Sequence, residues 1–225
     1  MGFEISDQVR ALNVQLQNFM DEHIYPRERE WHEWCHDPEH LWEVPAWYDD
    51  VRDKAKAEGL WNLFLPEEYA PWSPGLTNVE IAPLFETMSK VMWAQSVFNC
   101  NAPDRGNMEV LAKYGTPEQQ EQWLKPLLAG KIRSAYAMTE PQVASSDATN
   151  MELEIRRDGD EYVLNGCKWW TTGAVGPRCK IMLVMGKSNP ENDRHRQHST
   201  IMVPRDTPGV KLVRTLRAFD SLHSP

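Results

Sequence analysis

The chain has 225 residues, of which 41% are hydrophobic and 25% are charged, a balance that fits a globular protein with one large or two small domains. Its net charge of -9 argues against nucleic acid or an anionic membrane as the main partner. No apolar run approaches the ~20 residues of a membrane-spanning helix. The four cysteines lack C-x-x-C spacing, which indicates reduced thiols. We therefore expect a cytoplasmic protein, or a mitochondrial or peroxisomal one in a eukaryote.

The first 133 residues carry the apolar spacing of helices. Apolar residues at three- and four-residue steps predict an amphipathic helix from residue 6 to about 23, interrupted at Pro26. The same spacing recurs in three further stretches: 47–58, 79–91 and 108–114. Thr116 and Gln119 flank a helix start, with Thr as N-cap and Pro at the first helical position. We expect residues 1–133 to form an all-helical domain.

After residue 133 the apolar period becomes that of strands. Apolar residues alternate with charged ones on both sides of Asp158-Gly159, which predicts a β-hairpin turn there. Further strands are predicted between Gly, Pro and polar loops: 180–186, 199–204 and 209–214. We therefore expect an α+β fold in which residues 134–217 form an antiparallel β domain. Residues 218–225 remain as a truncated tail.

Two stretches of the predicted β domain place polar groups next to aromatic rings. The stretch 136–150 begins as a short apolar strand, meets Pro141, and then breaks into small residues, hydroxyls and amides. The stretch 168–173, Lys-Trp-Trp-Thr-Thr-Gly, adds flat aromatic surface and two hydroxyls. Hydroxyls and free N–H groups can hold a phosphate or a polar ring edge, and a Trp face can hold a flat heteroaromatic cofactor. Either stretch alone would fit a turn-rich β domain with a buried Trp.

Together, the two stretches resemble the flavin-binding signature of the acyl-CoA dehydrogenase family. The signature is carried by Tyr136-x-Met-Thr-Glu-Pro…Ser145-Ser-Asp and by Asn165-Gly-x-Lys-x-Trp170-x-Thr172-Gly. Other stretches match the family in order and spacing: Gly59-Leu-Trp-Asn-Leu-Phe-Leu-Pro66, Lys113-Tyr-Gly-Thr-x-Glu-Gln-Gln120 and Val203-Pro-x-Asp-Thr-Pro-Gly209. The form Ala144-Ser-Ser-Asp-Ala-Thr-Asn150 resembles the branch often fused to a phosphotransferase-like domain. The family has a glycine at Ala144 and commonly a glycine-rich loop at Gln142-Val143, and this chain departs from both.

The resemblance implies an FAD site on the β domain. Met138 and Thr139 match positions that bond the pyrimidine end of the flavin, and Tyr136 belongs to the same stretch. Ser145 matches a position that meets the pyrophosphate and touches the acyl-CoA substrate. Without the resemblance, Ser145 could equally cap a turn.

The second stretch would complete that site. By resemblance, Trp170 packs on the flavin, Thr172 bonds near the ring atom N5, and Thr171 lies between them. A Trp followed two residues later by a Thr is, taken alone, more often a packing feature.

The reaction implied by the resemblance is α,β-dehydrogenation of an acyl-CoA thioester. A carboxylate removes the α proton, the β hydride goes to the flavin, and an electron-transfer flavoprotein reoxidises it. In the family this carboxylate lies in a C-terminal helical domain, which also builds the homo-oligomer. The sequence ends at Pro225, so we name no catalytic residue and expect a truncated form with weak flavin binding and little turnover. Neither Glu140 nor Asp220 matches a motif for the base. An acyl-CoA oxidase would share the flavin-binding motifs, so the electron acceptor stays open.

Two functions of other classes stay open. One is a catalytically inactive protein that binds flavin or CoA. The other is a zinc peptidase, because His32, Glu33 and His36 fit the H-E-x-x-H pattern, with Glu58 as a further ligand. Pro38 would end that helix one turn after the second His, so a chance match is the better interpretation of the pattern.

Overall fold

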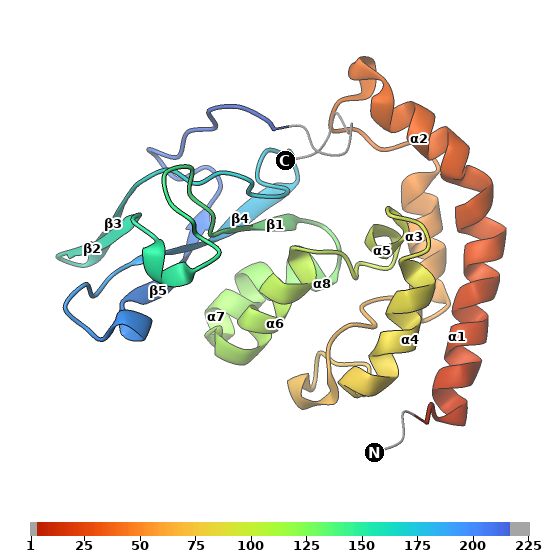
Figure 1. The fold of residues 1–225 in the computed structure, drawn as a ribbon. Coiled ribbons are helices and arrows are strands. Elements are labelled where there is room, and N and C mark those ends of the chain that lie inside the picture. The colour runs from red at the N-terminus through yellow and green to blue at the C-terminus, as the bar shows by residue number, and fades with distance from the viewer. Residues whose placement is uncertain (1–3, 217–225) are drawn as a thin grey trace. The chain divides into compact units, whose positions relative to one another are not determined.

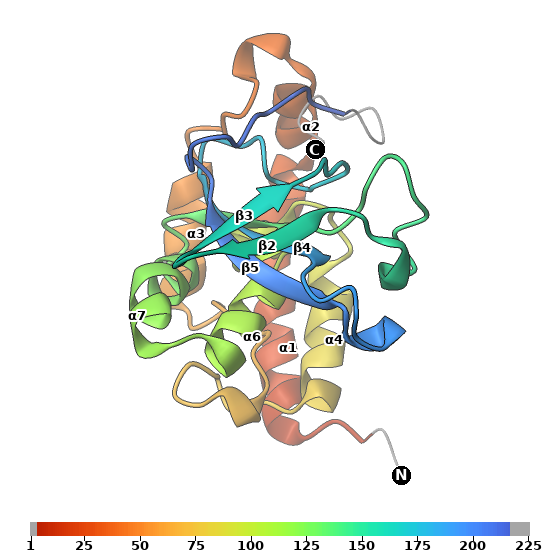
Figure 2. The same cartoon turned by 90° about the vertical axis from the view of Figure 1, so that its left-hand side faces the viewer.

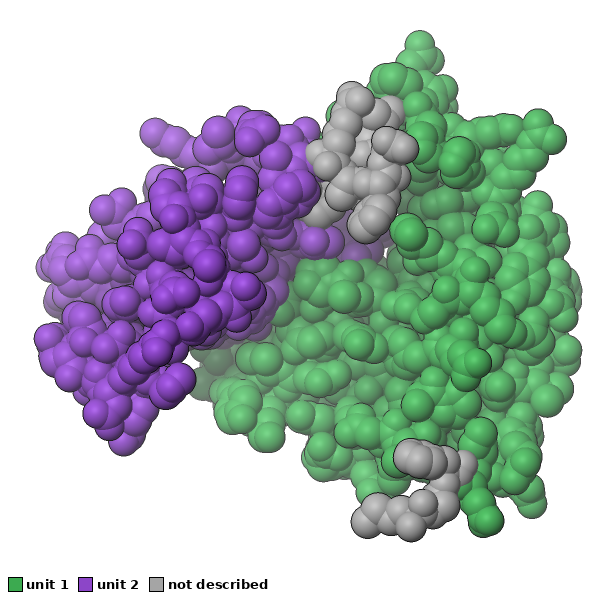
Figure 3. All heavy atoms as spheres, viewed as in Figure 1, with its two compact units in different colours: residues 1–130, 221–223 green, residues 131–220, 224–225 purple. Residues whose placement is uncertain are grey.

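The computed structural model describes residues 4–216; residues 1–3 and 217–225, including the tail predicted at 218–225, lie outside the described residues. Contacts divide the chain into two units, one ending at Gly130 and the other beginning at Lys131, coloured separately in Figure 3. The described residues of the first unit form helices, and those of the second form a sheet. No described helix combines the length and the apolar character that crossing a membrane requires.

The first unit begins with a long helical run (Figure 1). Ser6 caps α1 (Asp7–Phe19) by accepting a hydrogen bond from the Val9 N–H. The chain stays helical through a π-helical turn (Met20–Ile24) and a 3-10 turn (Tyr25–Arg27), and then enters α2 (Glu28–His36). The predicted interruption at Pro26 is therefore only a change of helix type. Proline is tolerated there because it occupies the first turn of a helical segment.

Further helices follow at the predicted stretches. They are α3 (Tyr48–Ala57), α4 (Asn78–Met88), α5 (Ala94–Val97), α6 (Asp104–Tyr114), α7 (Pro117–Gln119), a π-helical segment (Gln120–Leu124) and α8 (Lys125–Leu128). The predicted start at Thr116 is confirmed, because the Thr116 side chain accepts from the Gln119 N–H and the Gln119 side chain accepts from the Thr116 N–H. Thr77 and Glu80 form the same capping box at α4.

The apolar stripes of these helices, together with apolar residues of the loops between them, make the core of the first unit. Its largest fully buried side chains are Leu16, Met20, Ile24, Tyr48, Leu60, Leu65, Leu84, Met88, Phe98, Met108, Leu111 and Leu124. Helices as short as α3, α4 and α6, at 10, 11 and 11 residues, are marginal alone in water. Burial of this stripe, at about 1.5–3 kcal/mol for each large side chain, is what stabilises them.

The second unit is a five-stranded sheet (Figure 2). Its strands are β1 (Arg133–Ala137), β2 (Glu154–Asp158), β3 (Glu161–Asn165), β4 (Cys179–Lys187) and β5 (His198–Pro204). The hairpin predicted at Asp158-Gly159 is confirmed as the β2–β3 turn, where Gly159 adopts a φ of +63°. Strand β4 pairs with β1, with β5 and, at one residue pair, with β2.

The sheet is mixed, so the prediction of an antiparallel domain was wrong in this respect. β4 runs antiparallel to β5 but parallel to β1 and β2. β1 and β4 are separated in the chain by the whole β2–β3 hairpin, and a connection of that length can return the chain in the same direction. Apolar alternation marks which residues share a face and does not record strand direction.

The strand predicted at 209–214 is also wrong. No strand follows β5 among the described residues. Val210 packs against the core of the β unit, whereas the side chains of Leu212 and Val213 are 51% and 81% exposed. The apolar residues of this stretch therefore alternate as in a strand, and Val210 packs on the core. Within the described residues, the stretch nevertheless has no neighbouring strand to form backbone hydrogen bonds with.

One residue of the β-unit core is held between two glycines. Leu153 precedes β2 and is buried, and a Cβ at Gly186 would lie 2.6 Å from its Cδ2 atom. A Cβ at Gly166 would lie 2.8 Å from the Leu153 Cγ atom. Both glycines are needed because the backbone before β2 comes this close to β4 and to the chain after β3.

We expect Gly186→Ala to lower the free energy of unfolding by about 1–3 kcal/mol, because the new methyl meets Leu153 and Ile155 in a filled core. Urea denaturation followed by tryptophan fluorescence measures this. The matched control is Gly106→Ala in α6, where nothing lies within 4 Å of the new Cβ. That change should stabilise the protein by about 0.5–1 kcal/mol through helix propensity. Equal midpoints for Gly186→Ala and the unmodified chain would contradict the close approach.

Candidate functional site

The residues predicted for the site all lie in the β unit, in two segments. The first segment is β1 with the loop after it (Tyr136, Met138, Thr139, Ser145), and the second is the loop from β3 to β4 (Trp170, Thr171, Thr172). The backbone N–H of Trp169 donates to the Thr139 carbonyl at 3.0 Å and joins the two segments. The two stretches that the sequence singled out are therefore direct neighbours in the fold.

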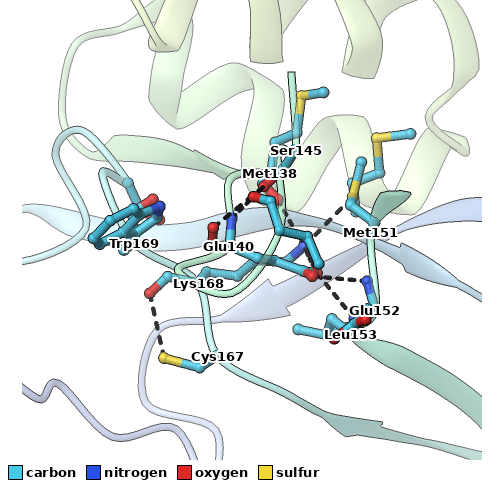
Figure 4. A network of polar contacts seen from close by, with 12 residues as sticks. Met138, Glu140, Ser145, Met151, Glu152, Leu153, Cys167, Lys168 and Trp169 are labelled. Carbon is cyan, nitrogen blue, oxygen red and sulfur yellow. Dashed lines mark hydrogen bonds and ion pairs between the residues drawn. The ribbon is translucent and has the colours of Figure 1, made fainter. Parts of the chain in front are cut away.

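A buried ion pair lies where these segments meet (Figure 4). Lys168 Nζ lies 2.7 Å from Glu140 Oε1, with side-chain exposures of 9% and 3%. The same ammonium donates to the Met138 carbonyl at 2.8 Å and contacts the Met151 Sδ at 3.5 Å. The pair thus connects the end of β1, the chain before β2 and the chain after β3.

The Glu140 carboxylate has two backbone donors besides Lys168. It accepts from the N–H groups of Glu152 at 2.7 Å and Leu153 at 2.9 Å. Burial on its own would raise the pKa of Glu140, but the bonds from Lys168 and from the two amides outweigh it and hold that pKa below its usual value. Burial lowers the pKa of Lys168, by more than Glu140 raises it. Glu140 is thereby kept as a fully bonded carboxylate.

Ser145 acts inside its own loop. It is 3% exposed, its hydroxyl accepts from the Glu140 N–H at 2.7 Å, and it lies 3.2 Å from the Val143 carbonyl, to which it can donate. The Ser145 N–H also donates to Val143, at 2.9 Å. These bonds close a tight turn against Glu140, so the side chain braces the loop after β1.

Trp170 has a strained backbone. Its φ is +51°, a region that bulky side chains rarely occupy, and its side chain is 45% exposed. Beside it, the buried indole Nε1 of Trp169 has no hydrogen-bond partner among the described residues. The two rings lie 6.0 Å apart with 55° between their planes. Strain and unpaired donors of this kind gather at functional sites, because the surrounding structure must hold them in place.

The predicted residues do not all face the same space. A hollow of about 910 Å³ lies on the sheet face that carries the β-unit core, and its lining includes Trp170 and Thr171. Tyr136 belongs to the other face, where its hydroxyl approaches the Met185 Sδ at 3.7 Å. Thr139 and Thr172 are outside the lining, and their hydroxyls make no side-chain hydrogen bond within residues 4–216.

These features fit a flat heteroaromatic cofactor. Thr139 and Thr172 offer unused hydroxyls, Trp169 offers an unused indole N–H, and Trp170 offers an exposed ring face. The sequence reasoning missed Lys168 and Trp169 as site residues and considered Glu140 only as a base. The sequence nevertheless contained a signal for the ion pair, because Glu140 and Lys168 are opposite charges inside the two stretches that carry the polar and aromatic groups.

The zinc pattern does not assemble into a metal site. His36 Nδ1 lies 2.7 Å from the His32 carbonyl, one turn back on α2, and the two imidazole rings stack at 4.1 Å. Within residues 4–216, no three or more His, Cys, Asp or Glu side chains are grouped to hold a metal ion, so Glu58 joins no such cluster. The helix ends at His36 itself, earlier than the predicted end one turn after the second His, and Pro38 begins a separate 3-10 turn.

Fold and site together define an α+β protein with a helical unit followed by a β unit whose loops suit a planar ligand. Two family models match the same division of the chain: "Acyl-CoA dehydrogenase, N-terminal domain" over residues 6–131 and "Acyl-CoA dehydrogenase, middle domain" over residues 135–222. The chain belongs to the acyl-CoA dehydrogenase family.

Relatives agree with this assignment. "Acyl-CoA dehydrogenase family member 10" of Mus musculus is 50% identical over 220 residues, which span 96% of this chain and 20% of that protein. "Probable acyl-CoA dehydrogenase FadE2" of Mycobacterium tuberculosis is 48% identical, over 97% of this chain and 53% of that protein. A solved structure from Mycobacterium abscessus, assigned to the acyl-CoA dehydrogenases, superposes with a TM-score of 0.90 at 46% identity, over 97% of this chain and 55% of its own. The chain thus spans about half or less of these relatives.

The lowered pKa of Glu140 makes stability depend on pH in a defined direction. A depressed carboxyl pKa contributes stability that is fully present above the unfolded value of about 4.3 and is lost as pH falls through the folded value. We expect Glu140→Gln to lower stability at pH 7 by about 3–5 kcal/mol, because it leaves Lys168 buried without its counter-charge. We also expect it to reduce the loss of stability between pH 5 and about pH 3.

Melting temperature measured from pH 3 to pH 7 tests both parts. The control is Asp158→Asn, which removes the exposed ion pair with Arg156 and should cost no more than about 1 kcal/mol at pH 7. If Glu140→Gln and Asp158→Asn give parallel curves, the buried pair does not control acid stability.

Proposed function

We propose that this chain supplies the flavin-holding surface of an acyl-CoA dehydrogenase that carries out α,β-dehydrogenation of acyl-CoA thioesters in fatty acid metabolism. The observation that carries the proposal is the contact between the two loops. The Trp169 N–H bonds the Thr139 carbonyl, Glu140 and Lys168 lie buried beside that contact, and Trp170 remains exposed. Family membership supplies the reason to identify the planar ligand as FAD.

Each predicted residue has a proposed part in holding FAD. Met138 and Thr139 would meet the edge of the flavin ring, with the Thr139 hydroxyl as the side-chain bond, and Tyr136, whose side chain lies on the other face of the sheet, would contribute through its backbone. Trp170 would present its face to the ring, and Thr171 and Thr172 would supply hydroxyls beside it.

Ser145 is proposed to meet the pyrophosphate and the acyl-CoA. Its hydroxyl already serves the turn at Glu140, so the exposed groups of that loop would take part as well. The chemistry that FAD provides when bound is to accept a hydride from the substrate. The chain's own contribution is to bind, to orient and to exclude water.

We assign no residue of this chain as the base that removes the α proton. Glu140 is unsuited, because its carboxylate is bonded to Lys168 and to two amides and its pKa is lowered. Asp220 lies outside the described residues. We propose that the base, the homo-oligomer and the contact with an electron-transfer flavoprotein belong to the remaining length of the whole protein. The compartment that we propose from the sequence is the cytoplasm.

The same surface would serve a protein that binds FAD or CoA without turnover. Joining this chain to the part of a full-length relative that it does not span, and assaying acyl-CoA dehydrogenation, separates the two. Turnover in the joined protein favours the dehydrogenase. A joined protein that holds FAD and stays inactive favours the binding protein.

We expect the purified chain to bind FAD weakly but measurably in a flavin fluorescence titration, and Trp170→Ala combined with Thr172→Ala to lose that binding. The variant removes the proposed ring contact and the proposed hydroxyl bond, and base-sized stacking contacts are worth about 1–3 kcal/mol, or roughly 5- to 150-fold in affinity. The control is Tyr114→Ala, which removes a 73% exposed aromatic ring from α6 in the other unit. Equal FAD affinity in the unmodified chain and the double variant would contradict the assigned site.

A further inference from the structure

The Glu140–Lys168 ion pair does more than fill the interior of the β unit, because it fixes backbone groups in four segments. Lys168 holds the Met138 carbonyl, and Glu140 holds the N–H groups of Glu152 and Leu153. Leu153 in turn accepts from the Lys187 N–H at 2.8 Å, at the end of β4. The end of β1, the chain before β2, the chain after β3 and the end of β4 are thereby tied to one pair of charges.

The groups held by this pair are immediate neighbours of the groups that would meet the ligand. Lys168 precedes Trp169, whose N–H bonds Thr139, and Met138 precedes Thr139 in the chain. Trp170 follows at once in a left-handed conformation that the local chain does not favour. A strained residue stays in place only when its surroundings hold it: the Trp170 carbonyl accepts from the Thr172 N–H at 3.1 Å, and the bonds of Lys168 and Trp169 hold the chain just before it.

Stability alone does not explain the pair. Two buried charges are expensive to desolvate, and well-packed apolar residues of similar volume would often stabilise a protein equally well. Apolar residues, however, make no directional bonds and so cannot fix the orientation of neighbouring backbone groups. Lys168 and Glu140 bond each other at 2.7 Å, and together they bond three backbone groups at 2.7, 2.8 and 2.9 Å, each bond with a preferred angle.

We propose that Glu140 and Lys168 are positioning residues of the cofactor site: their ion pair sets the backbone of residues 138–140 against residues 168–170, so that the Thr139 hydroxyl and the Trp170 ring are presented in one fixed arrangement. This inference rests on the proposed function, because the arrangement matters only if a flat cofactor binds there. The two side chains act through the backbone and need not touch the ligand.

The experiment separates positioning from folding by removing both charges together. Lys168→Met and Glu140→Gln, made singly, each leave a buried group without its partner and should lower the melting temperature most. The combined variant leaves no unpaired charge, and its Gln oxygen can accept from only one of the two amides that bond the separate carboxylate oxygens, so we expect its melting temperature to recover much of the loss while an amide loses its bond. The matched control is Arg156→Met, which removes the cation of the exposed Arg156–Asp158 pair in the same unit.

FAD affinity is then measured by flavin fluorescence quenching, at a temperature where circular dichroism shows every variant folded. Amide hydrogen exchange of Glu140, Glu152 and Leu153 is measured without FAD. We expect the combined variant to bind FAD at least tenfold more weakly than the unmodified chain and to lose protection at these amides. Arg156→Met should change neither quantity.

The outcomes can be told apart. If the unmodified chain binds FAD and the combined variant binds it equally well, the positioning inference is overturned and the proposed function stands. If the unmodified chain shows the protected amides but no FAD binding, the proposed flavin function of this chain fails, and the inference fails with it. Weaker binding in the combined variant, with a recovered melting temperature and an unchanged Arg156→Met control, supports the inference.

Discussion

The burial of one carboxylate constrains the whole β unit. Glu140 is 3% exposed, and a charge so deeply buried must be both paired and hydrogen-bonded to be tolerated. Its partners come from two other places in the chain, Lys168 and the amides that precede β2. Those amides reach it only because Gly166 and Gly186 let the backbone at Leu153 approach so closely. Sheet, glycines and ion pair therefore depend on one another.

The candidate site combines this hydrogen-bonded ion pair with an exposed, strained loop. Trp170 keeps a left-handed backbone and a half-exposed ring, while Trp169 anchors the same loop through its N–H bond to Thr139. Binding surfaces work best when the groups that touch a ligand are supported by side chains that do not move. The division between Trp170, which faces outward, and Lys168, which faces the interior, has this form.

Several elements could be read from the sequence because their causes are local. The capping box at Thr116 and Gln119 and the turn at Gly159 depend on residues three or fewer apart, and both formed as predicted. The direction of β4 against β1 depends on a long connection, and alternation carries no record of it. The stretch at 209–214 alternates like a strand but has no neighbouring strand among the described residues, which alternation alone could not show.

The sequence by itself determined the two-part order of helices and strands, and it carried the motifs that mark the family. These are properties of spacing and of residue type, so they can be read along the chain. Only the tertiary structure decided that Glu140 is a bonded structural carboxylate, that Ser145 braces its own turn, and that Lys168 links two loops. Each of these roles depends on which distant groups lie within hydrogen-bond distance in a low-dielectric interior, and that distance exists only once the chain has folded.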